Sequence, residues 1–186
     1  MAGVERRLAK TIGLGVMYGM GYNKMARELD IDPQDAKKML KDFRERVPFM
    51  QGMLEAVMNR ANSKGIIRTL LGRKCRFDLW EPTQWGVHKA LPHNQAKVEY
   101  GEAIKRYGTY KALNRLIQGS AADMTKKAMI DLHKEGIIPH IQVHDELDIS
   151  VSDNADKIKE IMENAVSLEV PNKVDYESGP NWGIIK

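Results

Sequence analysis

The sequence is poor in two features that would narrow its class at once, cysteine and long apolar runs. Cys75 is the only cysteine in 186 residues, which excludes an internal disulfide and a cysteine-based zinc site. No apolar run approaches the roughly 20 residues that span a bilayer, and residues 1–10 are too charged for a signal peptide. There are no internal repeats or low-complexity segments. We therefore expect a cytoplasmic globular protein without a membrane partner, which would bind any metal through oxygen or histidine.

The positive charge is modest in total but clustered along the chain. Hydrophobic residues make up 42% and charged residues 29%, a profile typical of a globular domain, and the net charge is +4. Three cations lie close together near the start of the chain, and four more lie in a predicted hairpin. The first group is Arg6, Arg7 and Lys10, and the second is Arg68, Arg73, Lys74 and Arg76. Clustering of this kind favours contact with phosphate groups.

The periodicity predicts helices first and a mixture of helices and strands afterwards. Helices are expected over residues 4–18, 23–29, 33 to about 43 and 48–63, the third of them capped by Asp32-Pro33. A basic hairpin follows over residues 66–77, whereas residues 78–92 show no clear period. Further elements are predicted as helices 94–107 and 110–134, strands 140–143 and 147–151, a helix capped by Ser152-Asp153, and a last strand 174–177. The one plausible boundary lies near Pro92.

Two interior glycines weaken the first predicted helix. Gly13 and Gly15 each cost about 1 kcal/mol relative to alanine, so another group must approach this backbone closely. A base pair would be one such group, and a packed neighbouring helix would be another.

The first helix and a later hairpin carry the residue types of phosphoryl transfer. Arg6 and Lys10 lie one turn apart and can reach one triphosphate, and Lys10 could also act as a general acid toward a leaving pyrophosphate. Without further context the same residues describe a solvated basic helix face. A polymerisation reaction would in addition need two metal ions held by carboxylates.

Asp145 and Glu146 lie where one predicted strand turns back into the next. Two carboxylates at a rigid edge suit magnesium, although adjacent acidic residues are also ordinary in surface turns. Alternating apolar residues on both sides predict a buried hairpin that holds this tip firmly. These are Ile141, Val143, Leu147 and Ile149.

The spacing of the first helix resembles motif B of the family A DNA polymerases, the DNA polymerase I type. That motif has arginine, lysine, an aromatic residue and Tyr-Gly at intervals of four, and here Arg6, Lys10, Leu14 and Tyr18-Gly19 occupy those positions. The resemblance implies that Arg6, Lys10, Leu14 and Tyr18 bind the nucleotide and that Gly19 contacts DNA. Leu14 replaces the usual aromatic residue, at a position that in the family influences sugar discrimination.

Five later segments resemble the same family. Residues 65–74 are similar to a hairpin of the fingers, which implies a DNA contact by Arg73, and residues 114–123 are similar to the helix that touches the primer–template minor groove. Asn114 and Gln118 are the expected readers there, since side-chain amides can test base-pair geometry without reading sequence, and Tyr110 stands where bacterial members often have arginine. Residues 142–147 match motif C, which implies that Asp145 and Glu146 are catalytic metal ligands and that His144 contacts DNA. The segments 170–171 and 179–182 resemble the family's C-terminal end.

The resemblance implies an α+β fold that is an incomplete polymerase right hand. Residues 1–92 would form a helical fingers subdomain, and residues 93–186 a palm with a small antiparallel sheet packed on helices. Because Met1 lies just before motif B, we expect motif A, with its metal-binding aspartate, and the thumb to come from a second polypeptide. A truncated or engineered fragment fits the sequence equally well.

The expected function is template-directed DNA polymerisation in viral DNA replication, in the host cytoplasm. The expected partners are primer–template DNA, deoxynucleoside triphosphates and the second polypeptide, with two Mg²⁺ ions per assembled active site. Two alternatives stay open, a non-catalytic DNA-binding or regulatory module and a metal-dependent nuclease built on Asp145 and Glu146. Nucleotide binding through Arg6 and Lys10 would separate a polymerase from a nuclease.

Overall fold

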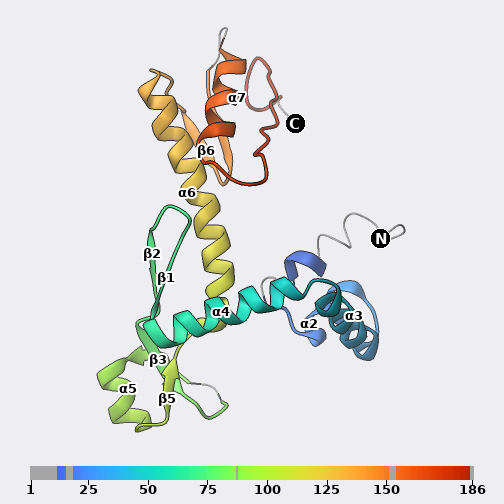
Figure 1. The fold of residues 1–186 in the computed structure, drawn as a ribbon, viewed down its shortest axis with the longest axis vertical. Coiled ribbons are helices and arrows are strands. Elements are labelled where there is room, and N and C mark those ends of the chain that lie inside the picture. Colours follow the sequence, from blue (N-terminus) through green and yellow to red (C-terminus); the bar gives the residue numbers. More distant parts are fainter. Residues whose placement is uncertain (1–11, 16–18, 87, 151–153, 185–186) are drawn as a thin grey trace. The chain divides into compact units, whose positions relative to one another are not determined.

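The computed structural model describes residues 12–15, 19–86, 88–150 and 154–184 (Figure 1). They fall into two compact units, divided between Ile117 and Gln118, a point that lies within helix α6 (Ala112–Lys134). Among the described residues no helix is both long enough and apolar enough to cross a membrane. The division of the chain into fingers and palm near residue 92 stays a prediction.

The first unit begins with a helical core. Residues 12–15 form a helical turn, followed by α2 (Tyr22–Leu29), α3 (Pro33–Arg46) and α4 (Pro48–Lys64). The Asp32 side chain accepts a hydrogen bond of 2.7 Å from the Gln34 backbone N–H, which confirms the predicted cap of α3. Ile12 packs in one cluster with buried residues of α2 and α3, which are Met25, Ala26, Ala36 and Leu40. Helix α4 is only partly buried, with Ala61 its single fully buried residue.

Two small antiparallel sheets complete this unit. Strands β1 (Ile66–Arg68) and β2 (Lys74–Arg76) form the predicted basic hairpin. The stretch without clear periodicity contains β3 (Leu79–Pro82) and β4 (Leu91–Pro92), and β5 (Ile104–Arg106) joins them in the order β4-β3-β5. Helix α5 (His93–Tyr100) is shorter than predicted, since Gly101 follows it with φ 75° and the chain then enters β5. A short 3-10 turn, η1 (Thr109–Lys111), leads into α6.

The second unit is built from the later part of α6, a hairpin and a helix. The hairpin consists of β6 (Ile141–Val143) and β7 (Glu146–Asp148), and α7 covers Ala155–Asn164. Leu132 of α6 and Ile158 of α7 are buried, and Lys157 Nζ lies 2.7 Å from a carboxylate oxygen of Glu135. The predicted cap Ser152-Asp153 lies outside the described residues. The last predicted strand was wrong, because the N–H of Val174 donates to the Glu163 carboxylate (3.1 Å) and residues 174–177 form no ladder.

Candidate active site

The two acidic residues of the motif C segment lie at the tip of the β6–β7 hairpin. Val143 pairs with Glu146, so the turn consists of two residues, His144 and Asp145. His144 has φ 54°, a left-handed conformation that is uncommon outside glycine and is found where surrounding structure enforces it. The Gln142 side-chain amide donates a 3.0 Å hydrogen bond to the His144 carbonyl. The sequence therefore builds a tight turn with a defined backbone, as predicted.

Both carboxylates of the tip are exposed and therefore accessible to a cation. Asp145 and Glu146 are neighbours in the chain and offer the hard oxygen ligands that Mg²⁺ prefers. In the parts of the chain that the structure describes, no group of three or more histidine, cysteine, aspartate or glutamate residues is arranged to hold a metal ion. The donor chemistry fits a divalent cation, but the described residues supply only part of a coordination shell.

The apolar side chains of this hairpin are not buried, so that prediction was wrong. Ile141 and Val143 are 41% and 37% exposed. The register pairs Ile141 with Asp148 and Gln142 with Leu147, so Ile141 and Val143 share a face while Leu147 lies on the opposite one. One face of the hairpin thus combines exposed apolar residues with the acidic side chain of Glu146.

The motif B residues are described only in part. Arg6, Lys10 and Tyr18 lie outside the described residues, whereas Leu14 is half-buried in the helical turn of residues 12–15. A Cβ at Gly15 would lie 2.7 Å from Cε of Met20, the flexible end of that side chain, and a Cβ at Gly13 would meet nothing within 4 Å.

Gly19, a predicted DNA contact, is exposed and has φ 72°. Glycine suits this position because other residues rarely adopt a left-handed backbone.

The basic hairpin presents its cations on strands with a firm base. Arg68, Arg73, Lys74 and Arg76 are exposed, whereas Ile67 and Phe77 are each 2% exposed. Gly72 has φ 86°, and its carbonyl accepts a 2.9 Å hydrogen bond from Arg68 Nη1, which fixes the turn beside Arg73. Arg115 of α6 lies over the Phe77 ring at 4.9 Å.

The predicted minor-groove residues lie on α6. Asn114 is half-buried and Gln118 is exposed, and their spacing of four places them on one helix face. Tyr110, in η1, is 55% exposed, with the Lys111 ammonium 5.4 Å from its ring centre.

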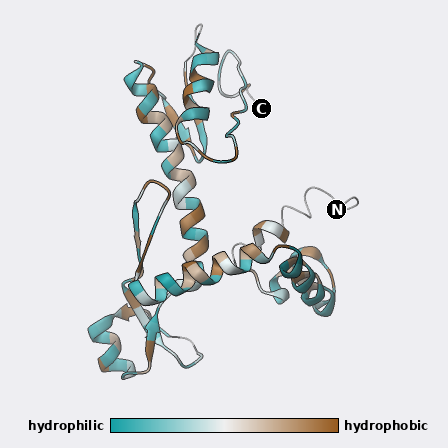
Figure 2. Ribbon diagram, viewed as in Figure 1, coloured by the Kyte–Doolittle hydropathy of each residue, from teal (hydrophilic) through white to brown (hydrophobic). Residues whose placement is uncertain are grey.

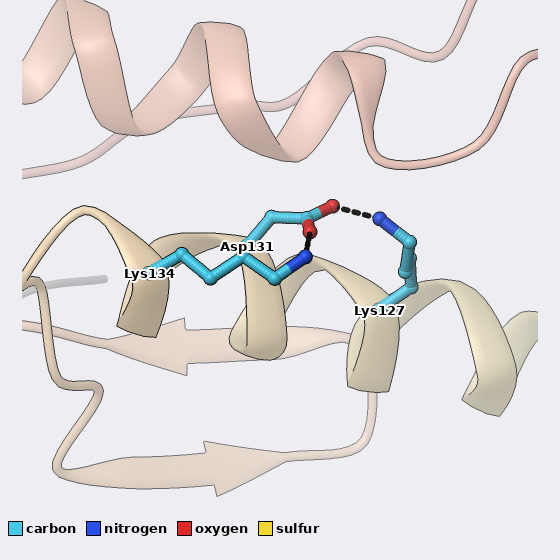
Figure 3. Close-up of polar contacts among 3 residues, drawn as sticks. All are labelled: Lys127, Asp131 and Lys134. Atoms are coloured by element: carbon cyan, nitrogen blue, oxygen red, sulfur yellow. Dashed lines mark hydrogen bonds and ion pairs between the residues drawn. The ribbon is translucent and has the colours of Figure 1, made fainter.

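An ion-pair cluster follows on the same helix in the second unit. Asp131 contacts the ammonium groups of both Lys127 and Lys134, the latter at 3.1 Å (Figure 3). Hydrogen bonds from Lys127 and then Lys134 lower the pKa of Asp131 below its ordinary value, against a smaller opposing effect of desolvation. Because these residues are three and four positions apart on one helix, the ion pairs stabilise α6 itself.

Sequence reasoning passed over a row of cations on α3. Lys37, Lys38, Lys41 and Arg44 line an open groove in the first unit. Their spacing of three and four residues could have predicted this row from the sequence, because it places the side chains on one side of a helix.

A solved structure identifies the class of the fold. Over 89% of its length the chain superposes on 28% of the POL domain of Pol1 from M. smegmatis, solved in complex with DNA primer-template and dNTP, with a TM-score of 0.66 and 29% sequence identity. The chain therefore has an α+β fold that is part of a polymerase right hand.

Sequence comparisons name the family. The model of DNA polymerase family A matches residues 1–184, and the chain belongs to this family. A DNA-directed DNA polymerase of Pseudomonas phage M6 is 34% identical over 98% of the chain and 30% of its own length. The thermostable DNA polymerase I of Thermus filiformis is 31% identical over 95% of the chain and 20% of its own length. The chain thus spans less than a third of the length of these relatives.

Proposed function

We propose that the chain forms part of the active site of a template-directed DNA polymerase that extends a primer with deoxynucleotides. The observation that carries the proposal is a pair of exposed carboxylates at the tip of a tight hairpin, Asp145 in the two-residue turn and Glu146 directly after it in β7. Membership of DNA polymerase family A over residues 1–184 supports it, as does the DNA and dNTP bound to the similar mycobacterial domain.

Asp145 and Glu146 would be ligands to two Mg²⁺ ions. Bound metal ions would neutralise charge on the phosphates during nucleotidyl transfer. The described residues supply only part of a coordination shell, so a further carboxylate from outside them would complete it. A second polypeptide that carries motif A and the thumb would supply it, and the exposed apolar face of β6–β7 is suited to contact such a segment.

The cationic residues of the first helix would hold the triphosphate. Arg6 and Lys10 lie one turn apart in the sequence pattern, so both side chains can reach one phosphate chain, with Tyr18 and Leu14 on the same stripe. Lys10 would also donate a proton toward the departing pyrophosphate.

Primer–template DNA would contact the basic hairpin and α6. Arg73 lies exposed in the turn of β1–β2, where its charge can meet backbone phosphate. Asn114 and Gln118 would donate to minor-groove acceptors, which recur at similar places in every correct base pair. Gly19 and His144 would lie against the DNA backbone.

Nucleotide binding separates this function from a nuclease. The purified chain should bind a deoxynucleoside triphosphate in equilibrium dialysis, and Arg6→Ala and Lys10→Ala should each weaken that binding. Lys24→Ala is the control, since Lys24 already faces Glu28 on α2. Binding that both variants leave unchanged would contradict the role of this helix, and metal-dependent DNA cleavage without nucleotide binding would favour the nuclease.

A further inference from the structure

One arginine at the start of α6 contacts the base of the basic hairpin. Arg115 Nη1 lies 3.5 Å from the carbonyl oxygen of Arg76 and 4.0 Å from Sγ of Cys75. The Arg115 guanidinium also lies over the Phe77 ring, with its central carbon 4.9 Å from the ring centre. Three successive residues of the hairpin and its base therefore meet a single side chain of α6.

An apolar cluster already joins the same elements. Ala112 of α6 is fully buried together with Ile67 and Phe77, and Leu116 packs against this cluster. Burial of apolar groups has no direction, so the cluster holds α6 beside the hairpin without fixing how the hairpin is turned. A planar guanidinium that donates to a carbonyl and stacks on a ring has a defined orientation. Arg115 therefore adds the directional contact that the cluster lacks.

The hairpin can carry this orientation from its base to its turn. Its ladder begins at the pair Ile66–Arg76, and toward the turn the Thr69 N–H donates to the Arg73 carbonyl at 3.0 Å. Arg73 lies three residues before Arg76, which is about 10 Å along a strand. Figure 2 colours most of β2 as hydrophilic, in keeping with a strand that presents cations to its surroundings.

The residue before Arg115 is one of the predicted minor-groove readers. Neighbouring side chains on a helix point about 100° apart, so Arg115 can face the hairpin while Asn114 faces away from it. The distance of about 10 Å from the Arg115 contact to Arg73 is short compared with one turn of duplex, about 34 Å. Contacts by Arg73 and Asn114 can therefore fall on one stretch of duplex.

We propose that Arg115 is a positioning residue, which fixes the basic hairpin on the start of α6 so that Arg73 reaches the same primer–template duplex that Asn114 contacts. The two DNA contacts rest on the proposed function. The hold of Arg115 on the hairpin does not rest on it.

Fluorescence anisotropy with a labelled primer–template duplex, at several salt concentrations, tests the link between Arg115 and Arg73. Losing one phosphate contact in Arg73→Ala should reduce the slope of log K against log salt by about 0.9, which is about eightfold weaker binding at about 0.1 M salt. Arg115→Ala should weaken binding at least about threefold, and the variant with both changes should lose about tenfold instead of the product of about 24-fold, because Arg115 acts through the hairpin.

The matched control removes another cation close by. Lys111 is exposed, lies four residues before Arg115 and has its ammonium 5.4 Å from the Tyr110 ring centre. Any loss caused by Lys111→Ala should multiply in full with that of Arg73→Ala, because the two residues act separately. Full multiplication of the Arg115→Ala and Arg73→Ala losses would overturn the proposal, as would wild-type binding by a folded Arg115→Ala variant.

Hydrogen exchange measured by mass spectrometry tests the hold on the hairpin without DNA. Arg115→Ala should speed amide exchange in residues 66–76 and leave it unchanged in residues 79–106. Arg115→Lys keeps the charge but not the planar fork, so it should show a smaller change in the same direction, and it replaces the alanine variant if that variant does not fold. Wild-type exchange across residues 66–76 in a folded variant would overturn the proposal.

The two measurements also separate this proposal from the proposed function. If Arg73→Ala and Asn114→Ala both leave duplex binding unchanged, the proposed DNA contacts fail and the positioning of Arg73 on DNA fails with them. The exchange result then still decides whether Arg115 holds the hairpin.

Discussion

The two hairpins β1–β2 and β6–β7 have a similar strand pairing and differ in charge. β1–β2 and β6–β7 each pair three residues of one strand with three of the next. The first presents arginine and lysine along its strands, and the second presents Asp145 in its turn and Glu146 at the start of β7. Cations suit phosphate and carboxylates suit a divalent metal, so the same backbone unit serves two sides of one proposed reaction.

The two hairpins also differ in how they are anchored. Ile67 and Thr69 of the basic hairpin are buried, and Phe77 directly after it is 2% exposed. In the acidic hairpin no residue from 141 to 148 is buried, and Ile141 and Val143 are exposed. The basic hairpin is thus anchored by buried residues of its own unit, whereas the acidic hairpin leaves apolar side chains exposed in the described part of the chain.

The largest effect is expected at the acidic tip. Asp145→Ala should reduce primer extension by the assembled enzyme more than about 100-fold. Loss of a residue that hydrogen-bonds to a metal ligand costs up to about 100-fold, and loss of the ligand itself should cost more. DNA binding should persist, since few phosphate contacts are lost. Asp175→Ala is the control, as Asp175 is an exposed aspartate of the same unit. Near-normal extension by Asp145→Ala would remove the metal role.

Truncating one apolar residue in each hairpin tests the difference in anchoring. Ile67→Ala should lower the free energy of unfolding by about 2–4 kcal/mol, since it leaves a cavity in a buried cluster. Val143→Ala should change it by no more than about 0.5 kcal/mol in the chain alone, and it should weaken assembly with the upstream polypeptide. Urea unfolding and a pull-down with that polypeptide measure the two effects. Equal stability losses would contradict the comparison.

Arg106 ties the base of the basic hairpin to the three-stranded sheet. Its Nε donates to the Asn62 carbonyl at 3.1 Å and its Nη1 to the Phe77 carbonyl at 2.9 Å, and its guanidinium lies over the Trp80 ring at 4.6 Å. Arg106→Ala should cost about 2 kcal/mol, within the range for hydrogen bonds from charged groups.

The neighbouring Lys105 supplies the control for that prediction. Its ammonium lies 3.8 Å from Glu81 at an exposed position, so Lys105→Ala should change stability by no more than about 0.5 kcal/mol in urea unfolding. If Arg106→Ala destabilises the chain no more than Lys105→Ala does, the Arg106 guanidinium does not hold the base of the hairpin.

The smallest effect concerns pH and the second unit. The pKa of Asp131 is lowered in the folded chain by Lys127 and Lys134, so its contribution to stability is present above the ordinary carboxyl pKa. It is lost as the pH falls through the lowered value. Asp131→Asn should therefore reduce stability at neutral pH. The variant should also lose less stability than the wild type as the solution becomes strongly acidic. Parallel wild-type and variant curves of thermal unfolding against pH would contradict this role.

Local signals allowed several elements to be predicted. The Asp32-Pro33 cap located α3, Gly72 between two β-rich runs located the basic hairpin, and the residues around Asp145 located the acidic turn. Each of these depends on residues close together in the sequence, where backbone preference and capping decide.

Features that depend on distant residues were missed. β3 pairs with β5 across more than twenty residues, and neither strand has enough length to show a period. Val174 has strand propensity but finds the Glu163 carboxylate in place of a ladder partner. The exposure of Ile141 and Val143 follows from the absence of covering residues in the described part of the chain, which no local pattern reveals.

The most direct test is primer extension with Mg²⁺ and all four deoxynucleotides, run with the purified chain alone and with an added polypeptide that carries the upstream palm segment and thumb. The proposal predicts extension only in the mixture, and its loss on Asp145→Ala. Extension by the chain alone would show that no carboxylate from a second chain is needed. Failure of a folded chain to extend in either case would contradict the polymerase assignment and favour a DNA-binding module.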